Sequence, residues 1–263
     1  MCRLFGLVCN RVVDLAFTLP HFSKLSDGNP DTWGIAWYAD DVPVMRTGAG
    51  KMADSPDLSS LKINARGRII ISHVRLARSE PYDERGAHPF IDQALGRHWV
   101  FAHNGDIDRA WIKCRLDRAP NLGPDSRFYF RYLIEKIEKS PGKSVEESLV
   151  ECLPELKKHS KISLNFLMSD GFKLYAFCGF NSNRRRYTLQ LARRPRIESR
   201  QLASQSAGYR QMLDAKLRMG EKAILVCSQD ITKREGELWD PIDNGTLLTV
   251  ERDSLRLYEQ RVW

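Results

Sequence analysis

The chain has 263 residues, 42% of them hydrophobic, and a formal net charge of +8. This length allows one large domain or two small ones, and the apolar content is enough for a substantial core. No apolar run approaches the roughly 20 residues that cross a bilayer, and no basic stretch followed by an apolar segment marks a secretory signal. The composition therefore predicts a cytoplasmic protein with no membrane partner.

The positive charge and the cysteines point to no particular ligand. The basic residues gather at 184–186 and between 193 and 200 and are diffuse elsewhere. No nucleic-acid-binding motif accompanies them, so a solvated basic face is favoured and no nucleic-acid partner is expected. The six cysteines show no C-x-x-C spacing and none stands near a histidine in the pattern of a zinc site. Neither a metal nor another cofactor is expected.

The first half of the chain reads mainly as strands separated by turns. Alternating or continuous apolar runs predict strands at residues 3–9, 33–38, 42–47, 68–75 and 99–103. A short helix is predicted from Ser55 to Asn64, with Ser55 as its N-cap and Pro56 at its first position. The polar residues 78–89 predict a loop, and Pro20 argues against one continuous helix over residues 14–26.

The second half predicts two helices and then a second group of strands. One helix begins at Asp125-Ser126, and the next begins at Ser144 with Glu147 in a capping-box pattern and Pro154 straining its end. Strands are predicted at residues 162–168, 173–178, 187–192, 223–227, 246–250 and 255–258. No linker or repeat interrupts the chain. The prediction is a single α+β domain over residues 1–263, with two helices between two groups of strands.

Cys2 stands in an unusual place for a structural thiol. Removal of Met1 is favoured when the next side chain is small, and it would leave Cys2 with both a thiol and a free α-amino group. The amine has a reference pKa near ~8 and the thiol one of about 8.5, so one residue could supply a base and a nucleophile. The alternative is that Cys2 is simply the first residue of a buried strand.

Three further segments place polar groups at strand ends or in loops. Arg75 ends a predicted strand and could grip a carboxylate with both arms of its guanidinium. Asn104 and Gly105 could donate hydrogen bonds to an oxyanion through a side-chain amide and a backbone N–H. Each also has an ordinary interpretation: Asn-Gly as a turn, Arg75 as an ion-pair partner, and His88 before Pro89 as a packed loop residue.

Taken together, five motifs resemble those of class II glutamine amidotransferases, which are N-terminal-nucleophile hydrolases, and most closely the stand-alone group without a fused synthase domain. The motifs are Met1-Cys2-Arg3-Leu4-Phe5-Gly6, Pro30-Asp31-Thr32-Trp33-Gly34-Ile35-Ala36, Ser72-His73-Val74-Arg75, His88-Pro89-Phe90 and Phe101-Ala102-His103-Asn104-Gly105. Later, Val226-Cys227-Ser228-Gln229 followed by Trp239 is similar to the family's "SEPL…W" segment. The resemblance thus touches nearly the whole chain.

The resemblance implies a four-layer αββα sandwich and cleavage of the γ-amide of glutamine. Cys2 would form a γ-glutamyl thioester, with Asn104 and Gly105 at the oxyanion positions. Arg75 would bind the substrate's α-carboxylate and Asp125 its α-ammonium group. The loop at His88 would shape the pocket. Glutamine or a γ-glutamyl small molecule is the implied ligand, and a protein that receives the ammonia is a further implied partner.

Three departures from the family pattern bear on the substrate rather than on the catalytic residues. Thr32 stands where the family usually has glycine, so a turn there would have to tolerate a β-branched residue. Arg78 stands where a small or hydroxyl residue is common, and Ser228-Gln229-Asp230 replaces the expected S-E-P. Arg78 keeps open a hydrolase of γ-glutamyl peptides or thiol metabolites. A non-catalytic partner subunit is the alternative from a different class.

Overall fold

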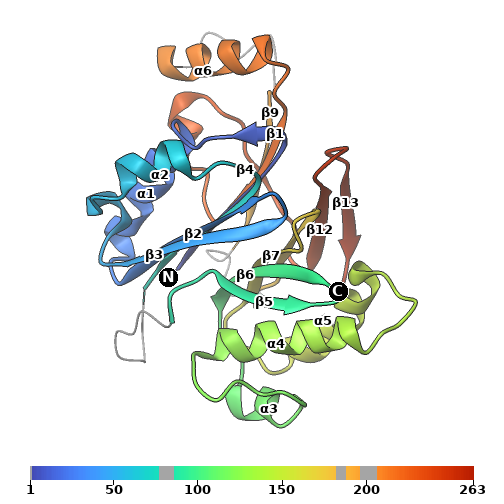
Figure 1. Ribbon diagram of the computed structural model, residues 1–263. Helices are drawn as coiled ribbons and strands as arrows, with labels where there is room; N and C mark the ends of the chain where they lie inside the picture. The colour runs from blue at the N-terminus through green and yellow to red at the C-terminus, as the bar shows by residue number, and fades with distance from the viewer. Residues whose placement is uncertain (1, 77–85, 182–187, 196–205) are drawn as a thin grey trace.

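Two antiparallel sheets form the centre of the computed structural model, which describes residues 2–76, 86–181, 188–195 and 206–263 (Figure 1). The first sheet has seven strands in the order β11-β9-β10-β1-β4-β2-β3, and the second has six in the order β13-β12-β8-β7-β6-β5. Their bounds are β1 Arg3–Val13, β2 Thr32–Ala39, β3 Val42–Ala49, β4 Gly67–Arg75, β5 Phe90–Ala94, β6 Arg97–Gly105, β7 Leu164–Ser169, β8 Lys173–Cys178, β9 Gln190–Arg194, β10 Ala223–Cys227, β11 Asp240–Pro241, β12 Thr246–Glu251 and β13 Leu257–Arg261.

Helices cover the outer faces of both sheets, which gives the four layers of the predicted αββα sandwich (Figure 1). The six α-helices of the described residues are α1 Thr18–Ser23, α2 Leu58–Asn64, α3 Arg109–Lys113, α4 Asp125–Glu138, α5 Val145–Lys157 and α6 Ala207–Arg218. Short 3₁₀ turns occur at Lys24–Gly28, Met52–Asp54 and Lys233–Glu235. The predicted hairpin of β2 and β3, turning at Asp40 and Asp41, is confirmed.

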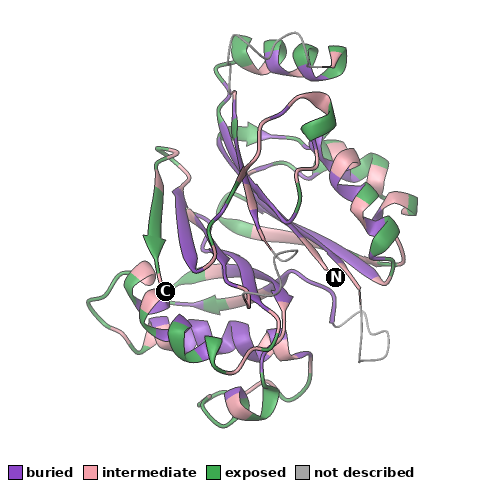
Figure 2. Cartoon of the chain, turned by 180° about the vertical axis from the view of Figure 1, so that it is seen from behind, coloured by how far each residue is buried: buried purple, intermediate pink, exposed green. Residues whose placement is uncertain are grey.

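Alternation along the central strands divides the apolar residues between two cores. In β1, Leu4 and Val8 point into the core between the sheets, whereas Phe5 and Leu7 point into the core under α1 and α2. The two sheets approach so closely at Gly6 that a Cβ there would lie 3.0 Å from a methyl group of Leu167. The central strands are therefore buried on both faces, as Figure 2 shows.

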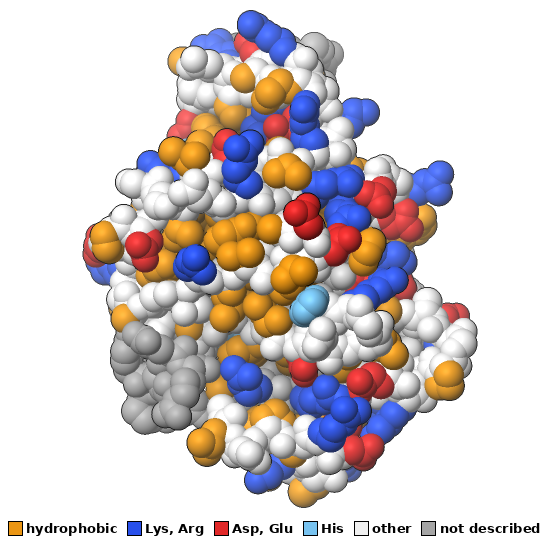
Figure 3. All heavy atoms as spheres, viewed as in Figure 1, with side chains coloured by type: hydrophobic (Ala, Val, Ile, Leu, Met, Phe, Trp, Pro, Cys, Tyr) orange, Lys and Arg blue, Asp and Glu red, His pale blue; other side chains and the backbone are white. Residues whose placement is uncertain are grey.

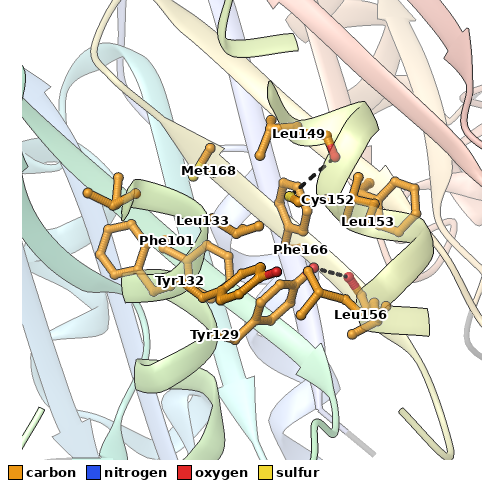
Figure 4. Packing of buried hydrophobic residues seen from close by; sticks show 14 of the residues in the cluster. Phe101, Tyr129, Tyr132, Leu133, Leu149, Cys152, Leu153, Leu156, Phe166 and Met168 are labelled. Carbon is orange, nitrogen blue, oxygen red and sulfur yellow. Dashed lines mark hydrogen bonds between the residues drawn. The ribbon is translucent and has the colours of Figure 1, made fainter. Parts of the chain in front are cut away.

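The third core lies between the second sheet and the pair α4 and α5 (Figure 4). Tyr129 of α4 packs edge-on against Phe101 of β6, with ring centroids 5.5 Å apart. Ser144 and Glu147 form the predicted capping box at the start of α5. The two predicted helices thus pack on the strand that ends at Asn104 and Gly105, and α4 begins at Asp125.

Several predicted boundaries differ from the structure. The helix predicted from Ser55 begins at Leu58, because Ser55 is extended and closes the preceding 3₁₀ turn. Pro154 lies within α5 and does not end it. A helix does form within residues 14–26, and Pro20 is tolerated because it lies in the first turn of the six-residue α1. α3, α6 and β5 were not predicted: α3 is a single turn, α6 buries only two apolar side chains, and polar residues interrupt β5.

Thr32 does not occupy a strained turn. It is the first residue of β2, pairs with Arg75, and is not among the residues with positive φ. A β-branched residue suits such an extended position, so the concern raised by the departure from glycine is resolved. Its side chain is fully buried and its hydroxyl has no hydrogen-bond partner among the described residues.

Gly34, two residues further along β2, is required by the approach of the loop that contains His88. An ideal Cβ at Gly34 would lie 2.1 Å from the carbonyl oxygen of His88. We expect Gly34→Ala to lower the free energy of unfolding by about 1–3 kcal/mol, because the loop must shift. The measurement is chemical denaturation. Gly28→Ala is the matched control, because nothing lies within 4 Å of a Cβ at Gly28. Equal stability of both variants would contradict this account.

Charges of both signs are mixed over the visible surface. On the face in Figure 3, Lys and Arg side chains stand among Asp and Glu and around a central apolar area. In the described parts of the chain, no helix is long and apolar enough to span a membrane. The basic residues 184–186 and those from 196 to 200 lie outside the described residues, so for them the expectation of a solvated basic face stays a prediction. For Arg194 it is wrong, because this side chain is buried and pairs with Glu237.

Candidate active site

Cys2 and Arg75 lie at the same end of the seven-stranded sheet. β1 begins at Arg3, which pairs with Val74 of the neighbouring strand β4. Cys2 therefore stands opposite Arg75, one residue further along each strand. The register that the sequence could not give thus brings the proposed nucleophile beside the proposed carboxylate clamp.

Both side chains are on the face that looks toward the second sheet. Leu4 in β1 and Ile71 in β4 point into the inner core, and positions two or four residues away on a strand share the same face. Cys2 and Arg75 occupy such positions. Alternation also places Asn104 of β6 on the inner face, because Val100 and Ala102 belong to the inner core.

Asn104 joins the two sheets at this end of the sandwich. Its side-chain Nδ2 donates a hydrogen bond of 2.9 Å to the carbonyl oxygen of Cys2. Gly105 follows, and an ideal Cβ there would lie 1.7 Å from the carbonyl oxygen of Ser163, so only glycine fits. The structure therefore brings Cys2, Asn104 and Gly105 together, with an amide donor beside the thiol-bearing residue.

The Cys2 thiol is half-buried and lies 3.8 Å from the carbonyl oxygen of Leu76. Burial raises the pKa of this thiol above its ordinary value, although the nearby charges of Arg75 and Arg3 act in the opposite direction. The thiol is consequently protonated at neutral pH. A reaction that starts from the thiolate needs a base close to Cys2.

Arg75 lies along the start of the segment that carries His88. A Cβ at Gly86 would lie 3.2 Å from Nη1 of Arg75, so the guanidinium lies against the Gly86 backbone. The backbone carbonyl of Arg75 accepts a hydrogen bond from the N–H of Asp31 at 3.2 Å. The segment that begins at Asp31 and leads into β2 is therefore held against the end of β4.

Asp125 is the first residue of α4, and its carboxylate is fixed on one side by backbone donors. Oδ2 accepts from the N–H of Ile107 at 2.9 Å, and Oδ1 accepts from the N–H of Ser126 at 2.7 Å. Oδ1 also accepts from the Ser126 hydroxyl at 3.3 Å, so the second lone pair of Oδ2 is the one that can still accept from a cation. Ile107 is two residues beyond Gly105, so this bond places the Asp125 carboxylate beside the end of β6.

Three buried histidines lie behind the clamp and the oxyanion residues. The rings of His73 and His88 meet edge-on with centroids 4.5 Å apart, and His103 is 1% exposed. Burial lowers the pKa of His73 to about 3 and that of His88 well below its ordinary value. Burial also lowers the pKa of His103. All three imidazoles are therefore neutral at neutral pH.

His88 is buried within this group and does not line an open surface. It is 4% exposed and packs on His73 and Phe90, and neither ring nitrogen has a hydrogen-bond partner among the described residues. Its role in shaping the pocket stays a prediction. The sequence motifs included His73 and His103, but no role was assigned to either, because their proximity depends on the pairing of separate strands.

The segment after β10 anchors the start of β1. Ser228 accepts a hydrogen bond from the N–H of Leu4 at 2.9 Å and donates its own N–H to the Leu4 carbonyl at 3.0 Å. Arg3 Nε donates to Gln229 Oε1 at 2.9 Å. The motif at residues 226–229 thus lies next to Cys2 in the fold, although it is more than 220 residues away in the sequence. Gln229 makes this contact as a neutral amide, where the family pattern has Glu.

Some candidate features lie outside this geometry. Arg78 falls in residues 77–85, outside the described part of the chain. Within the described part, no three His, Cys, Asp or Glu side chains are arranged to hold a metal ion. All six cysteines are free thiols.

Comparison with known proteins gives relatives over nearly the whole chain. "Putative glutamine amidotransferase" of Haemophilus influenzae is 26% identical over 255 residues, covering 93% of this chain and 82% of that protein. A solved structure described as a predicted glutamine amidotransferase of Pseudomonas aeruginosa has a TM-score of 0.57 at 20% identity, covering 97% of this chain and 99% of that one.

A second solved structure matches the fold over the full chain. It is described as the allosteric regulatory enzyme of purine biosynthesis, with a TM-score of 0.70 at 16% identity. All of this chain is covered, but the chain spans only 49% of the length of that one. The family model of class II glutamine amidotransferases matches residues 1–261. The chain therefore belongs to the class II glutamine amidotransferase family.

Proposed function

We propose that this chain is a single-domain enzyme that hydrolyses the γ-amide of glutamine through a thioester on Cys2, once Met1 has been removed. Hydrolysis or transfer of the glutamine amide is the general chemistry of the family. The observation that carries the finer proposal is the hydrogen bond between Asn104 Nδ2 and the Cys2 carbonyl, with Arg75 opposite Cys2 in the register. A nucleophile, an oxyanion donor and a carboxylate clamp then share one end of the sandwich.

In the proposed reaction the α-amine of Cys2 takes the proton of the thiol. This base is needed because burial raises the thiol pKa. The thiolate attacks the γ-carbonyl carbon, and the developing oxyanion accepts from the Asn104 amide and the Gly105 N–H. The α-ammonium of Cys2 returns the proton to the leaving nitrogen, the C–N bond breaks and ammonia departs. Water then cleaves the thioester to give glutamate and the free thiol.

The zwitterionic head of the substrate needs one cationic and one anionic partner. Arg75 would bind the α-carboxylate with two parallel hydrogen bonds. Asp125 would bind the α-ammonium group, and its fixed carboxylate limits the reorganisation needed on binding. The neutral histidines behind these residues add no positive charge that would compete for the substrate carboxylate.

The test is a substrate comparison on purified protein with an authenticated N-terminus. We expect release of equal amounts of glutamate and ammonia from glutamine, with a higher kcat/KM than for a γ-glutamyl dipeptide. Faster turnover of the dipeptide would favour the γ-glutamyl hydrolase alternative. Hydrolysis of neither would favour a non-catalytic partner subunit. A protein acceptor for the ammonia and a cytoplasmic location are further parts of the proposal.

A further inference from the structure

We propose that His103 and Ser126 are positioning residues, which hold the Asp125 carboxylate in register with the oxyanion end of β6. The inference rests on the proposed function, since it gives these residues a part in the same site. Neither needs to touch the substrate. They act through Asp125 on one side and through the strand end at Gly105 on the other.

The Ser126 hydroxyl lies between an imidazole and a carboxylate. Its Oγ is 2.9 Å from Nδ1 of His103 and 3.3 Å from Oδ1 of Asp125. Ser126 is 5% exposed and His103 is 1% exposed, so water does not compete for these contacts. One hydroxyl therefore links α4 to β6 at the first turn of α4, which begins at Asp125, the proposed ammonium-binding residue.

The other edge of the His103 ring faces the oxyanion residue. An ideal Cβ at Gly105 would lie 2.8 Å from Nε2 of His103, so this nitrogen is next to the Gly105 backbone. Tyr129 packs edge-on against the ring with centroids 5.0 Å apart, and Phe101 stacks at 6.3 Å. The aromatic neighbours fix the plane of the imidazole. A single rigid ring thus spans the distance between Ser126 and Gly105.

A neutral ring suits this role. Burial lowers the pKa of His103, while the charges of Asp125 and Asp106 act in the opposite direction. The neutral imidazole bonds to Ser126 without placing a second cation beside the α-ammonium group of the substrate. Asp125 keeps its two backbone donors, Ile107 and Ser126, whether or not the hydroxyl is present. Loss of the hydroxyl should therefore misplace the carboxylate slightly without unfolding the helix.

The first test separates binding from chemistry. We expect Ser126→Ala to raise KM for glutamine about tenfold with kcat nearly unchanged, since one hydrogen bond to a charged group is lost. Ser126→Thr keeps the hydroxyl and should restore KM. Ser148→Ala is the matched control: Ser148 is also buried in the first turn of a helix, and its hydroxyl donates to the Ser144 carbonyl at 3.0 Å. An unchanged KM in Ser126→Ala would overturn the inference.

The second test asks whether the effect passes through the α-ammonium group. Inhibition constants are measured for L-glutamate and for glutarate, which lacks the amino group. Ser126→Ala should raise the inhibition constant of L-glutamate about tenfold and leave that of glutarate unchanged, because only L-glutamate has an amino group for Asp125 to bind. His103→Phe, which keeps the aromatic packing, should behave alike, and the double variant should be no worse than either single one.

Equal weakening of both inhibitors would show a general structural role and overturn the inference. If the wild-type enzyme hydrolyses glutamine and Ser126→Ala has the same KM, kcat and inhibition constants, the inference about His103 and Ser126 is overturned but the proposed function is not. A wild-type protein that neither hydrolyses glutamine nor binds L-glutamate would overturn the proposed function and this inference with it.

Discussion

Cys2→Ser is expected to lower kcat/KM for glutamine by at least about 10³-fold, because the nucleophile itself is exchanged for a far weaker one. Serine at this position still permits removal of Met1, so the α-amine is kept and the effect isolates the sulfur. The fold should be unaffected, since Cys2 is only half-buried and the contact of its thiol with the Leu76 carbonyl is long, at 3.8 Å. Ammonia release and thermal unfolding are measured on the same preparation.

Cys114→Ser is the matched control, because Cys114 is an exposed free thiol outside the site. It should retain full activity, and thiol-directed inactivation should be unchanged in it and absent in Cys2→Ser. A Cys2→Ser protein with kcat/KM within tenfold of the wild type would show that another group attacks the substrate.

The second large effect is expected in a buried ion pair far from the site in sequence. Arg194 pairs with Glu237 through Nε and through Nη2, the latter at 2.8 Å, and the two side chains are 4% and 1% exposed. Arg194 Nη1 also donates to the Thr18 hydroxyl at 2.7 Å. Glu237→Ala would leave Arg194 buried and unpaired. We expect a loss of about 3–5 kcal/mol in the free energy of unfolding, measured by chemical denaturation.

The control for this variant is Glu151→Ala, which breaks an exposed pair with Lys143 and should cost less than about 1 kcal/mol. Replacing Arg194 and Glu237 together with Met and Leu should recover a large part of the loss, because no unpaired charge is left behind. Equal stability of Glu237→Ala and Glu151→Ala would contradict the assignment.

The contribution of Glu237 should also depend on pH. Burial alone raises the pKa of Glu237, but Arg194 and the hydrogen bonds from Thr232 and Tyr209 outweigh it and hold the pKa below its ordinary value. A carboxyl with a lowered folded pKa stabilises the fold above its unfolded pKa of about 4.3, and this is lost as the pH falls through the folded value. The difference between wild type and Glu237→Ala should therefore be full at neutral pH and shrink in acid.

The sequence predicted those helices and strands that are specified by neighbouring residues. The β-branched run of β4 and the capping box at Ser144 are read from neighbouring residues, and both are confirmed. α6 was missed because only Tyr209 and Leu213 are buried, so its apolar period is too weak. The four layers were predicted from the resemblance of the motifs. The order of the strands within each sheet was not predicted, since pairing between distant strands leaves no period in the sequence.

The candidate site could be predicted only as separate pieces. The motifs named Cys2, Arg75 and Asn104, but the contact of Asn104 with the Cys2 carbonyl joins residues 102 positions apart. The link from His103 through Ser126 to Asp125 likewise depends on how α4 packs against β6. These contacts depend on strand register and on the packing of separate elements, so they cannot be predicted from residue spacing within one segment. The roles assigned to the site residues stay predictions.

The most direct test of the central claim is mass spectrometry of the N-terminal peptide after treatment with 6-diazo-5-oxo-norleucine, a glutamine analogue that alkylates such cysteines. We predict an adduct on a peptide that begins at Cys2 and lacks Met1, with Cys114 unmodified. That result would establish processing, the nucleophile and a pocket that accepts glutamine in a single measurement. A peptide that retains Met1 in an active enzyme, or a label on a different cysteine, would contradict the mechanism.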